Sequence, residues 1–390
     1  MQKDAYLYNE RCFFMEECLN CGNRESKYFA IKNNKYYCRR CLSFKCEHPI
    51  PVRELNNHVY FQINYDLSLM QKEISIKVVK AFINKQNVLI KAVCGSGKTE
   101  LVYGVIEYAL KNNLQVGFTV PRKDVIIDLL PRIKNAFPLN KVIGLYGGHT
   151  EEKQGDIILL TTHQLYRYVN YFDLLIIDET DAFPYYGNFL LNKMFDKALK
   201  GNYIMLSATP LEEMIEKIKN ENGVIFELNK RYHGKNIPEP KLIKSLLFKE
   251  IITIYFLFKF VNDNKPTMVF TPTIDCCEKL YRLISFLKKN GNYVHSKKEN
   301  RDQIIEKFKQ GELKYLICTS VLERGVTIKN VQVIVYKASH NLYDQKTLIQ
   351  IAGRVGRKID AYDGEVIFVG EYISSSMRGA LNEIRKANTS

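Results

Sequence analysis

The chain has 390 residues, enough for about two or three domains, and its 46% hydrophobic and 25% charged residues are typical of a globular protein, which excludes disorder. Its 57 Lys and Arg against 42 Asp and Glu give a net charge of +15, which permits a polyanion partner or an anionic membrane face. An AT-rich genome would produce the same excess of lysine without any partner, so the charge must be located along the chain.

Membrane-spanning and secreted proteins are also excluded. The longest apolar run, Ile251–Phe258, is far shorter than the roughly 20 residues that a membrane-spanning helix needs. The first residues, Met1–Glu10, are charged and lack the apolar core of a secretory signal. We therefore expect a cytoplasmic protein, in which cysteines are metal ligands or buried thiols rather than disulfides.

Four N-terminal cysteines form two C-x2-C pairs that are separated by sixteen residues. Each pair brings two thiolates to one side of a tight turn, and two such turns provide the tetrahedral sulfur set that Zn2+ prefers. Residues 1–60 have little apolar sequence with which to bury four thiols, so we predict a zinc-binding module there. Its predicted ligands are Cys18, Cys21, Cys38 and Cys41, with Cys12, Cys46 and His48 as alternatives.

From about Leu67 the sequence alternates between short apolar runs and amphipathic stretches, the pattern of a parallel sheet covered by helices. The predicted helices of this part are Glu100–Lys111 and Asp124–Ala136. Its predicted strands are Val88–Ala92, Val116–Val120, Asp156–Thr161, Leu174–Asp178 and Tyr203–Ser207.

A polar segment with one Gly and two Pro, residues 229–240, precedes a second run of the same kind, with a predicted helix at Asp275–Lys289. Its predicted strands are Thr267–Thr271, Leu316–Thr319, Val331–Tyr336 and Glu365–Val369. We therefore expect an α/β protein with two parallel-sheet lobes. The expected division is a four-cysteine module at 1–60, a first lobe at 61–228, a linker at 229–240 and a second lobe at 241–390.

A phosphate-binding loop follows the first predicted strand, where residues 92–99 read Ala-Val-Cys-Gly-Ser-Gly-Lys-Thr. A strand before and a helix after this spacing are the context that a P-loop requires. Lys98 is expected to reach the β- and γ-phosphates of ATP, and Thr99 to bind Mg2+. The backbone N–H groups expected to surround the phosphates belong to Gly95, Ser96 and Gly97.

Two further strands are predicted to deliver polar groups to the same site. Asp178 ends a buried strand and is placed to hold Mg2+, and Glu179 is the candidate base that orders the attacking water. Gln71, upstream of the loop, is a candidate for reading the adenine edge. The next strand ends in a candidate coupling motif formed by Ser207, Ala208 and Thr209.

The second lobe supplies candidate arginines for phosphoryl transfer. In the run Gln-Ile-Ala-Gly-Arg-Val-Gly-Arg, which begins at Gln350, Arg354 and Arg357 are three residues apart, which predicts one face of a helical turn. Arginines there would stabilise the charge that develops on the γ-phosphate. Upstream, Arg324 and Gly325 lie in a block expected to contact both nucleotide and nucleic acid.

Together these motifs resemble the core of a superfamily 2 helicase or translocase, and more narrowly the ComFA family of late competence ATPases, over nearly the whole chain. The resemblance implies two RecA-like lobes that use ATP and Mg2+ and a module that binds Zn2+. It also implies a cytoplasmic motor at the inner face of the membrane that drives single-stranded DNA through a ComEC-type channel, with a ComFC-type partner. Whether it forms a homo-oligomer stays open.

The resemblance and the expected strand ends give candidate contacts to the DNA backbone. Small hydroxyls and backbone N–H groups suit phosphate contacts that do not read sequence. The candidates are Pro121, Arg122, Gly147, Gly148, His149, Thr161 and Thr162 in the first lobe, and Thr271, His295, Thr319 and Ser320 in the second.

The basic charge is concentrated in the second lobe. Residues 226–390 hold 28 basic and 17 acidic side chains, whereas residues 61–225 hold 19 and 18. A genome-wide bias toward lysine would not concentrate the basic residues in one lobe. We therefore expect the second lobe to supply most of the salt-dependent affinity for nucleic acid.

Two other functions stay open at this point. One is a general DNA repair or replication-restart helicase of the PriA type, which would unwind duplex DNA. The other is a zinc-bearing adaptor whose ATPase has decayed, against which the complete set of motifs argues.

Overall fold

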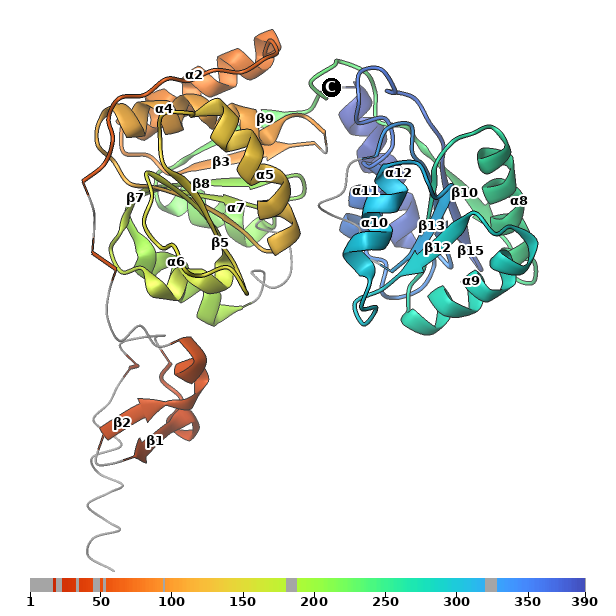
Figure 1. Ribbon diagram of the computed structural model, residues 1–390, viewed down its shortest axis with the longest axis horizontal. Helices are drawn as coiled ribbons and strands as arrows, with labels where there is room; N and C mark the ends of the chain where they lie inside the picture. The colour runs from red at the N-terminus through yellow and green to blue at the C-terminus, as the bar shows by residue number, and fades with distance from the viewer. Residues whose placement is uncertain are drawn as a thin grey trace, which may run out of the picture. The chain divides into compact units, whose positions relative to one another are not determined.

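The computed structural model describes residues 17–18, 23–32, 35–44, 50–51, 54–93, 95–179, 188–319 and 328–389 (Figure 1). The chain divides into two compact units, which we treat separately. The first comprises Met1–Asp66, Lys72–Ile90 and Leu101–Phe226, and the second comprises Leu67–Gln71, Lys91–Glu100 and Glu227–Ser390. Within the described residues, no helix is both long enough and apolar enough to cross a membrane.

The N-terminal module is a short antiparallel hairpin between two 3-10 turns. Strands β1 (Phe29–Lys32) and β2 (Lys35–Cys38) pair with Phe29 opposite Cys38. The turns η1 (Ser26–Tyr28) and η2 (Arg39–Phe44) flank them. The hairpin therefore places Cys38 at the start of η2, the turn that carries Cys41.

The first lobe is built on a seven-stranded sheet in the order β5-β6-β4-β7-β8-β3-β9. The strands β5, β6, β4, β7 and β8 pair in parallel, so their carboxyl ends share one edge of the sheet. The strands are β3 (Val88–Ala92), β4 (Val116–Val120), β5 (Val142–Leu145), β6 (Ile157–Thr161), β7 (Phe172–Asp178), β8 (Leu199–Ser207) and β9 (Val224–Leu228).

These strands are almost continuously apolar because both faces of the sheet are covered. The helix α6 begins with Asn188 as its N-cap, whose side chain accepts from the backbone N–H groups of Leu190 and Leu191. The helices of this lobe are α2 (Leu69–Ile83), α3 (Lys98–Leu101), α4 (Tyr103–Lys111), α5 (Lys123–Ala136), η3 (Thr162–Arg167), α6 (Phe189–Ala198) and α7 (Glu212–Asn220).

The second lobe is a wholly parallel six-stranded sheet in the order β10-β15-β14-β11-β13-β12. Alternate residues of its strands enter two cores: Val269 and Ile334 face one, and Met268 and Val333 the other. The strands are β10 (Pro240–Lys244), β11 (Thr267–Phe270), β12 (Gly291–Val294), β13 (Tyr315–Cys318), β14 (Gln332–Tyr336) and β15 (Val366–Gly370).

Helices cover both faces of this second sheet. The helices α8 and α9 enclose one core and α10, α11 and α12 the other. Thr273 caps α9 and Asp344 caps α11 through side-chain oxygens. The helices are α8 (Lys249–Asn262), α9 (Ile274–Leu287), α10 (Arg301–Lys309), α11 (Gln345–Ala352) and α12 (Ser375–Thr389).

Two parallel sheets, each in its own lobe, confirm the predicted α/β fold class. Residues 229–239 contain no helix or strand, and Pro240, which the sequence assigned to the linker, begins β10.

Candidate ATP site and zinc centre

The phosphate loop connects the end of β3 at Ala92 to the start of α3 at Lys98. Gly95 and Gly97 have left-handed backbones, with φ of +81° and +77°, a conformation that glycine adopts without steric cost. A Cβ on Gly97 would also lie 2.5 Å from Nε2 of Gln71, so a larger residue there would displace the Gln71 amide. Ser96 and Thr99 are buried. The loop therefore has the strand, turn and helix start expected of a phosphate cradle.

Gln71 lies against this loop. Its side chain is buried, its Nε2 donates to the carbonyl of Ser96 at 2.8 Å, and its Oε1 accepts from the backbone N–H of Ser68 at 2.9 Å. Both ends of the amide are thus bonded to backbone, one of them to the phosphate loop itself. Its predicted contact with adenine stays a prediction.

The acidic pair lies where β7 ends. Asp178 is the last residue of the strand, and its Oδ1 accepts from the backbone N–H of Glu179 at 2.8 Å. Glu179 has a φ of +56°, a left-handed conformation that is costly for a residue with a Cβ. Such local strain is typical of functional positions, where the surrounding structure holds a side chain in one direction.

The strand beside this pair carries the predicted coupling motif. Asp178 lies in register with Leu206 of β8, and the strand ends at the buried Ser207. Ser207 Oγ accepts from the backbone N–H of Thr209 at 3.1 Å, which holds the turn through Ala208. The acidic pair and this turn therefore lie at neighbouring strand ends.

The arginine run differs from its predicted form. The helix α11 ends at Ala352, so Arg354 and Arg357 lie in the turn beyond it and not on one helical face. Gln350 is in the helix and buried, and Arg354 is only 2% exposed. The Nε of Arg357 donates to the carbonyl of Gly353 at 3.0 Å, which folds its side chain over the turn. Gly356, with a φ of +71°, favours a chain that leaves the helical path within this turn.

Seven candidate residues lie outside the described residues. They are Cys21, Ser320, Arg324 and Gly325, and the alternative zinc ligands Cys12, Cys46 and His48.

The first lobe gathers its candidate DNA contacts along one sheet edge. Pro121 and Arg122 follow β4, and Thr161 and Thr162 stand where β6 ends. The turn after β5 is formed by Gly147, Gly148 and His149. Because β5, β6 and β4 are adjacent and parallel, these groups share the carboxyl edge. The turn is exposed, whereas both threonines are buried.

The second lobe repeats this arrangement with less exposed groups. Thr271, His295 and Thr319 follow the adjacent parallel strands β11, β12 and β13 and are all buried. Thr271 donates to the carbonyl of Cys318 at 3.3 Å, and Nε2 of His295 lies 3.2 Å from Oε1 of Glu278. Their contact with nucleic acid stays a prediction.

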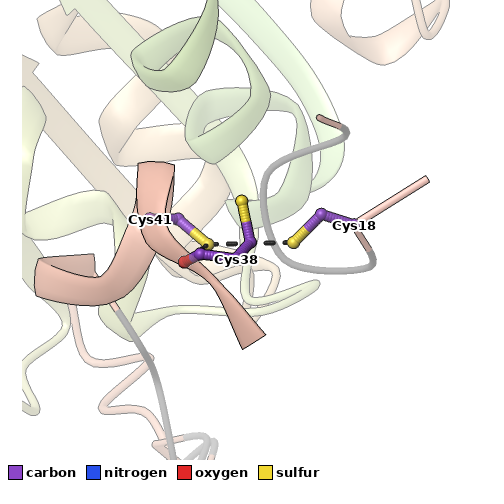
Figure 2. A group of neighbouring side chains, drawn as sticks. All are labelled: Cys18, Cys38 and Cys41. Carbon is purple, nitrogen blue, oxygen red and sulfur yellow. Dashed lines mark hydrogen bonds between the residues drawn. The ribbon is translucent and has the colours of Figure 1, made fainter. Parts of the chain in front are cut away.

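Three of the four predicted zinc ligands lie together in the N-terminal module (Figure 2). Cys18, Cys38 and Cys41 are buried, and their sulfur atoms lie within 4.8 Å of one another. The sulfurs of Cys18 and Cys41 are 3.8 Å apart. Tetrahedral zinc with Zn–S bonds of about 2.3 Å separates its sulfurs by about 3.8 Å, so this donor set fits the metal.

The cysteine cluster packs against the first lobe. Leu190 of α6 lies against the cysteines, and the guanidinium of Arg40 is 5.5 Å from the centre of the Phe189 ring. The cysteine module therefore contacts the start of α6.

Sequence comparison identifies the chain. It is 34% identical to the "Competence protein ComFA" of Bacillus subtilis (strain 168), covering 99% of this chain and 89% of that protein. It is 31% identical to the "Competence protein ComFA" of Streptococcus pneumoniae (strain ATCC BAA-255 / R6), covering 95% and 90%. The chain belongs to the ComFA family.

Domain models agree with this assignment. Residues 64–212 of this ComFA chain match the model "Type III restriction enzyme, res subunit", and residues 247–358 match "Helicase conserved C-terminal domain". A variant of Saccharomyces cerevisiae Dbp5 bound to RNA and ADP BeF3 has a TM-score of 0.62 at 17% identity, covering 83% of this chain and 92% of its own, which shows the RecA-like helicase fold. This ComFA chain is thus a nucleic-acid-dependent ATPase of superfamily 2.

One candidate residue of this ComFA chain escaped sequence reasoning. Arg231, in the segment interpreted as a linker, is only 2% exposed and donates to three carbonyls of the arginine turn. No motif or spacing marks it, because its partners are more than 100 residues away in the sequence.

Proposed function

We propose that this ComFA-family ATPase translocates single-stranded DNA and drives its uptake during natural transformation. The observation that carries the proposal is the 34% identity to a competence protein, which extends over 99% of this chain. The chain also contains the full set of ATPase motifs predicted from its sequence. A ComEC-type membrane channel and a ComFC-type protein are the partners that this role requires, at the cytoplasmic face of the membrane.

The phosphates of ATP fit the loop before α3. Gly95 and Gly97 turn the backbone so that its N–H groups can surround an anion at a helix start. Lys98 neutralises the β- and γ-phosphates, and Thr99 and Asp178 offer the oxygen ligands that Mg2+ prefers. Mg2+ held by these residues would supply positive charge that offsets the negative charge developing on the phosphates during hydrolysis.

The remaining candidates act on water and on charge. Glu179, held in a strained backbone, orients the attacking water and accepts its proton. Arg354 and Arg357 stabilise the charge on the γ-phosphate oxygens. The turn held by Ser207 follows β8, next to the acidic pair at the end of β7. We infer that this turn couples ATP hydrolysis to the sheet edge that carries the candidate DNA contacts.

The DNA strand is gripped mainly through its phosphates. The exposed turn Gly147–His149 leaves open space around both of its glycines, which lets a backbone phosphate approach the N–H groups. The excess of basic side chains in residues 226–390 adds a grip that does not depend on sequence.

The test compares Lys98→Ala and Glu179→Gln with the control Lys77→Ala, which removes an exposed lysine paired with Glu73. We expect both site variants to fold and to lose DNA-stimulated ATP hydrolysis, while the control keeps the wild-type rate. Translocation is measured by displacement of a protein block from the end of single-stranded DNA. A full hydrolysis rate in either site variant contradicts the site, and hydrolysis without displacement contradicts the motor.

A further inference from the structure

A buried arginine holds together the turn that carries Arg354 and Arg357. The Nη1 of Arg231 donates to the carbonyls of Val355 at 2.7 Å and Gly356 at 2.6 Å, and its Nη2 donates to the carbonyl of Gly353 at 3.2 Å. These carbonyls belong to neighbouring residues of one turn. A single guanidinium therefore gathers three carbonyl dipoles that would otherwise repel one another.

The two residues after Arg231 bind the same turn. Tyr232 accepts the backbone N–H of Ile359 at 3.0 Å through its hydroxyl. The Nδ1 of His233 accepts from the backbone N–H of Lys235, so the proton is on Nε2, which donates to the carbonyl of Gly356 at 3.0 Å. Arg231, Tyr232 and His233, which we call the clamp, thus contact the turn from 353 to 359 at five points.

The turn is shaped around this arginine. Gly356 has a φ of +71°, and a Cβ on it would lie 2.9 Å from Nη1 of Arg231 and 2.2 Å from the carbonyl oxygen of Tyr362. The Nε of Arg357 donates to the same Gly353 carbonyl that Nη2 of Arg231 reaches. A glycine is therefore required at 356, and the direction of Arg357 is coupled to that of Arg231.

The phosphate loop approaches the same two arginines. Within the same compact unit, a Cβ on Gly95 would lie 3.6 Å from Nε of Arg231 and 3.7 Å from Cγ of Arg357. The clamp thus holds the arginine turn at the place where a glycine of the phosphate loop comes close.

We propose that Arg231 is a positioning residue for ATP hydrolysis, which acts by fixing the turn that aims Arg354 and Arg357. Its Nη1 and Nη2 groups donate to carbonyls of the turn, so we expect it to act through the other two arginines. The proposal rests on the proposed role of those two arginines in hydrolysis.

The test measures kcat and KM for ATP, at saturating single-stranded DNA, in full-length variants whose folded fraction is checked by thermal unfolding. We expect Arg231→Gln to lower kcat at least tenfold with KM within twofold of wild type. Arg231→Lys keeps the positive charge but loses the planar set of N–H donors, so its kcat should lie between those of Arg231→Gln and wild type. The control Arg385→Gln, which removes an exposed arginine paired with Glu239 at 2.8 Å, should stay within twofold.

A combined variant distinguishes positioning from simple support of the fold. If Arg231 acts only through Arg354 and Arg357, adding Arg231→Gln to the variant Arg354→Ala/Arg357→Ala makes it no slower. The proposal is overturned if the decreases in kcat multiply when the substitutions are combined. It is also overturned if Arg231→Gln has a wild-type kcat per folded molecule. If Arg231→Gln fails to fold, His233→Ala carries the same tests. Wild-type rates in both Arg354→Ala and Arg357→Ala would instead overturn the arginine roles in the proposed function.

Discussion

The strained backbone of Glu179 predicts opposite orders of stability for glycine and alanine at two positions of the first lobe. At 179 the φ of +56° costs a residue with a Cβ roughly 1–2 kcal/mol. The greater freedom of glycine in the unfolded chain cancels roughly 0.5–1 kcal/mol of this. Glu179→Gly should therefore be roughly 0.5–1 kcal/mol more stable than Glu179→Ala, which raises Tm by roughly 1–4 °C in a lobe of this size.

The control pair is placed at Glu216, an exposed residue in the interior of α7. In a helix alanine is favoured over glycine by about 1 kcal/mol, so the order of the two variants should reverse there. Scanning calorimetry of the full chain gives the unfolding transition. Both variants at 179 should also lose ATP hydrolysis at least about 100-fold, because the base is gone. An alanine variant at 179 as stable as the glycine variant would refute the argument from strain, and an active one would refute the role of the carboxylate.

Three further predictions concern metal, pH and salt. Protein purified without chelator should hold about one zinc per chain, and Cys41→Ser should lose most of it in elemental analysis; metal-free wild-type protein would exclude the site. Burial lowers the pKa of His233 below its ordinary 6.5, so the stability that the neutral ring supplies is complete above pH 6.5 and is lost as the pH falls from there through the lowered pKa. His233→Gln should flatten the pH dependence of Tm in that window, and an unchanged slope would show that the ring does not contribute. Affinity for single-stranded DNA should fall steeply with salt, and charge-reversing pairs of lysines in residues 226–390 should reduce that slope; affinity that ignores salt would leave the basic charge without a role.

Buried strands were predictable because their signal is local. The residues Val88–Ala92 and Val116–Val120 form β3 and β4 with the predicted bounds, since a short apolar run bounded by polar residues is sufficient to define such a strand. Four strands of the lobes were missed. The strands β5 and β12 each have only four residues and contain a glycine, and β9 and β10 adjoin the segment interpreted as a linker.

The phosphate loop and the acidic pair were also placed correctly relative to the strands they follow. The arginine turn was not, because a three-residue spacing indicates one helical face only where the helix continues, and α11 ends at Ala352. Arg231 could not be predicted, since its importance comes from carbonyls that the fold brings to it. Local patterns thus define the strands and the chemistry at their ends, whereas the contacts that aim a side chain depend on tertiary structure.

The central claim, a motor on single-stranded DNA, is tested most directly by ATP turnover against a length series of single-stranded DNA, duplex DNA and single-stranded RNA, with and without bound zinc. A translocase hydrolyses more ATP per binding event on a longer track, so we expect the rate to rise with the length of single-stranded DNA and to stay low on duplex. A rate that does not depend on length, or one that duplex DNA or RNA stimulates as strongly, would contradict the account.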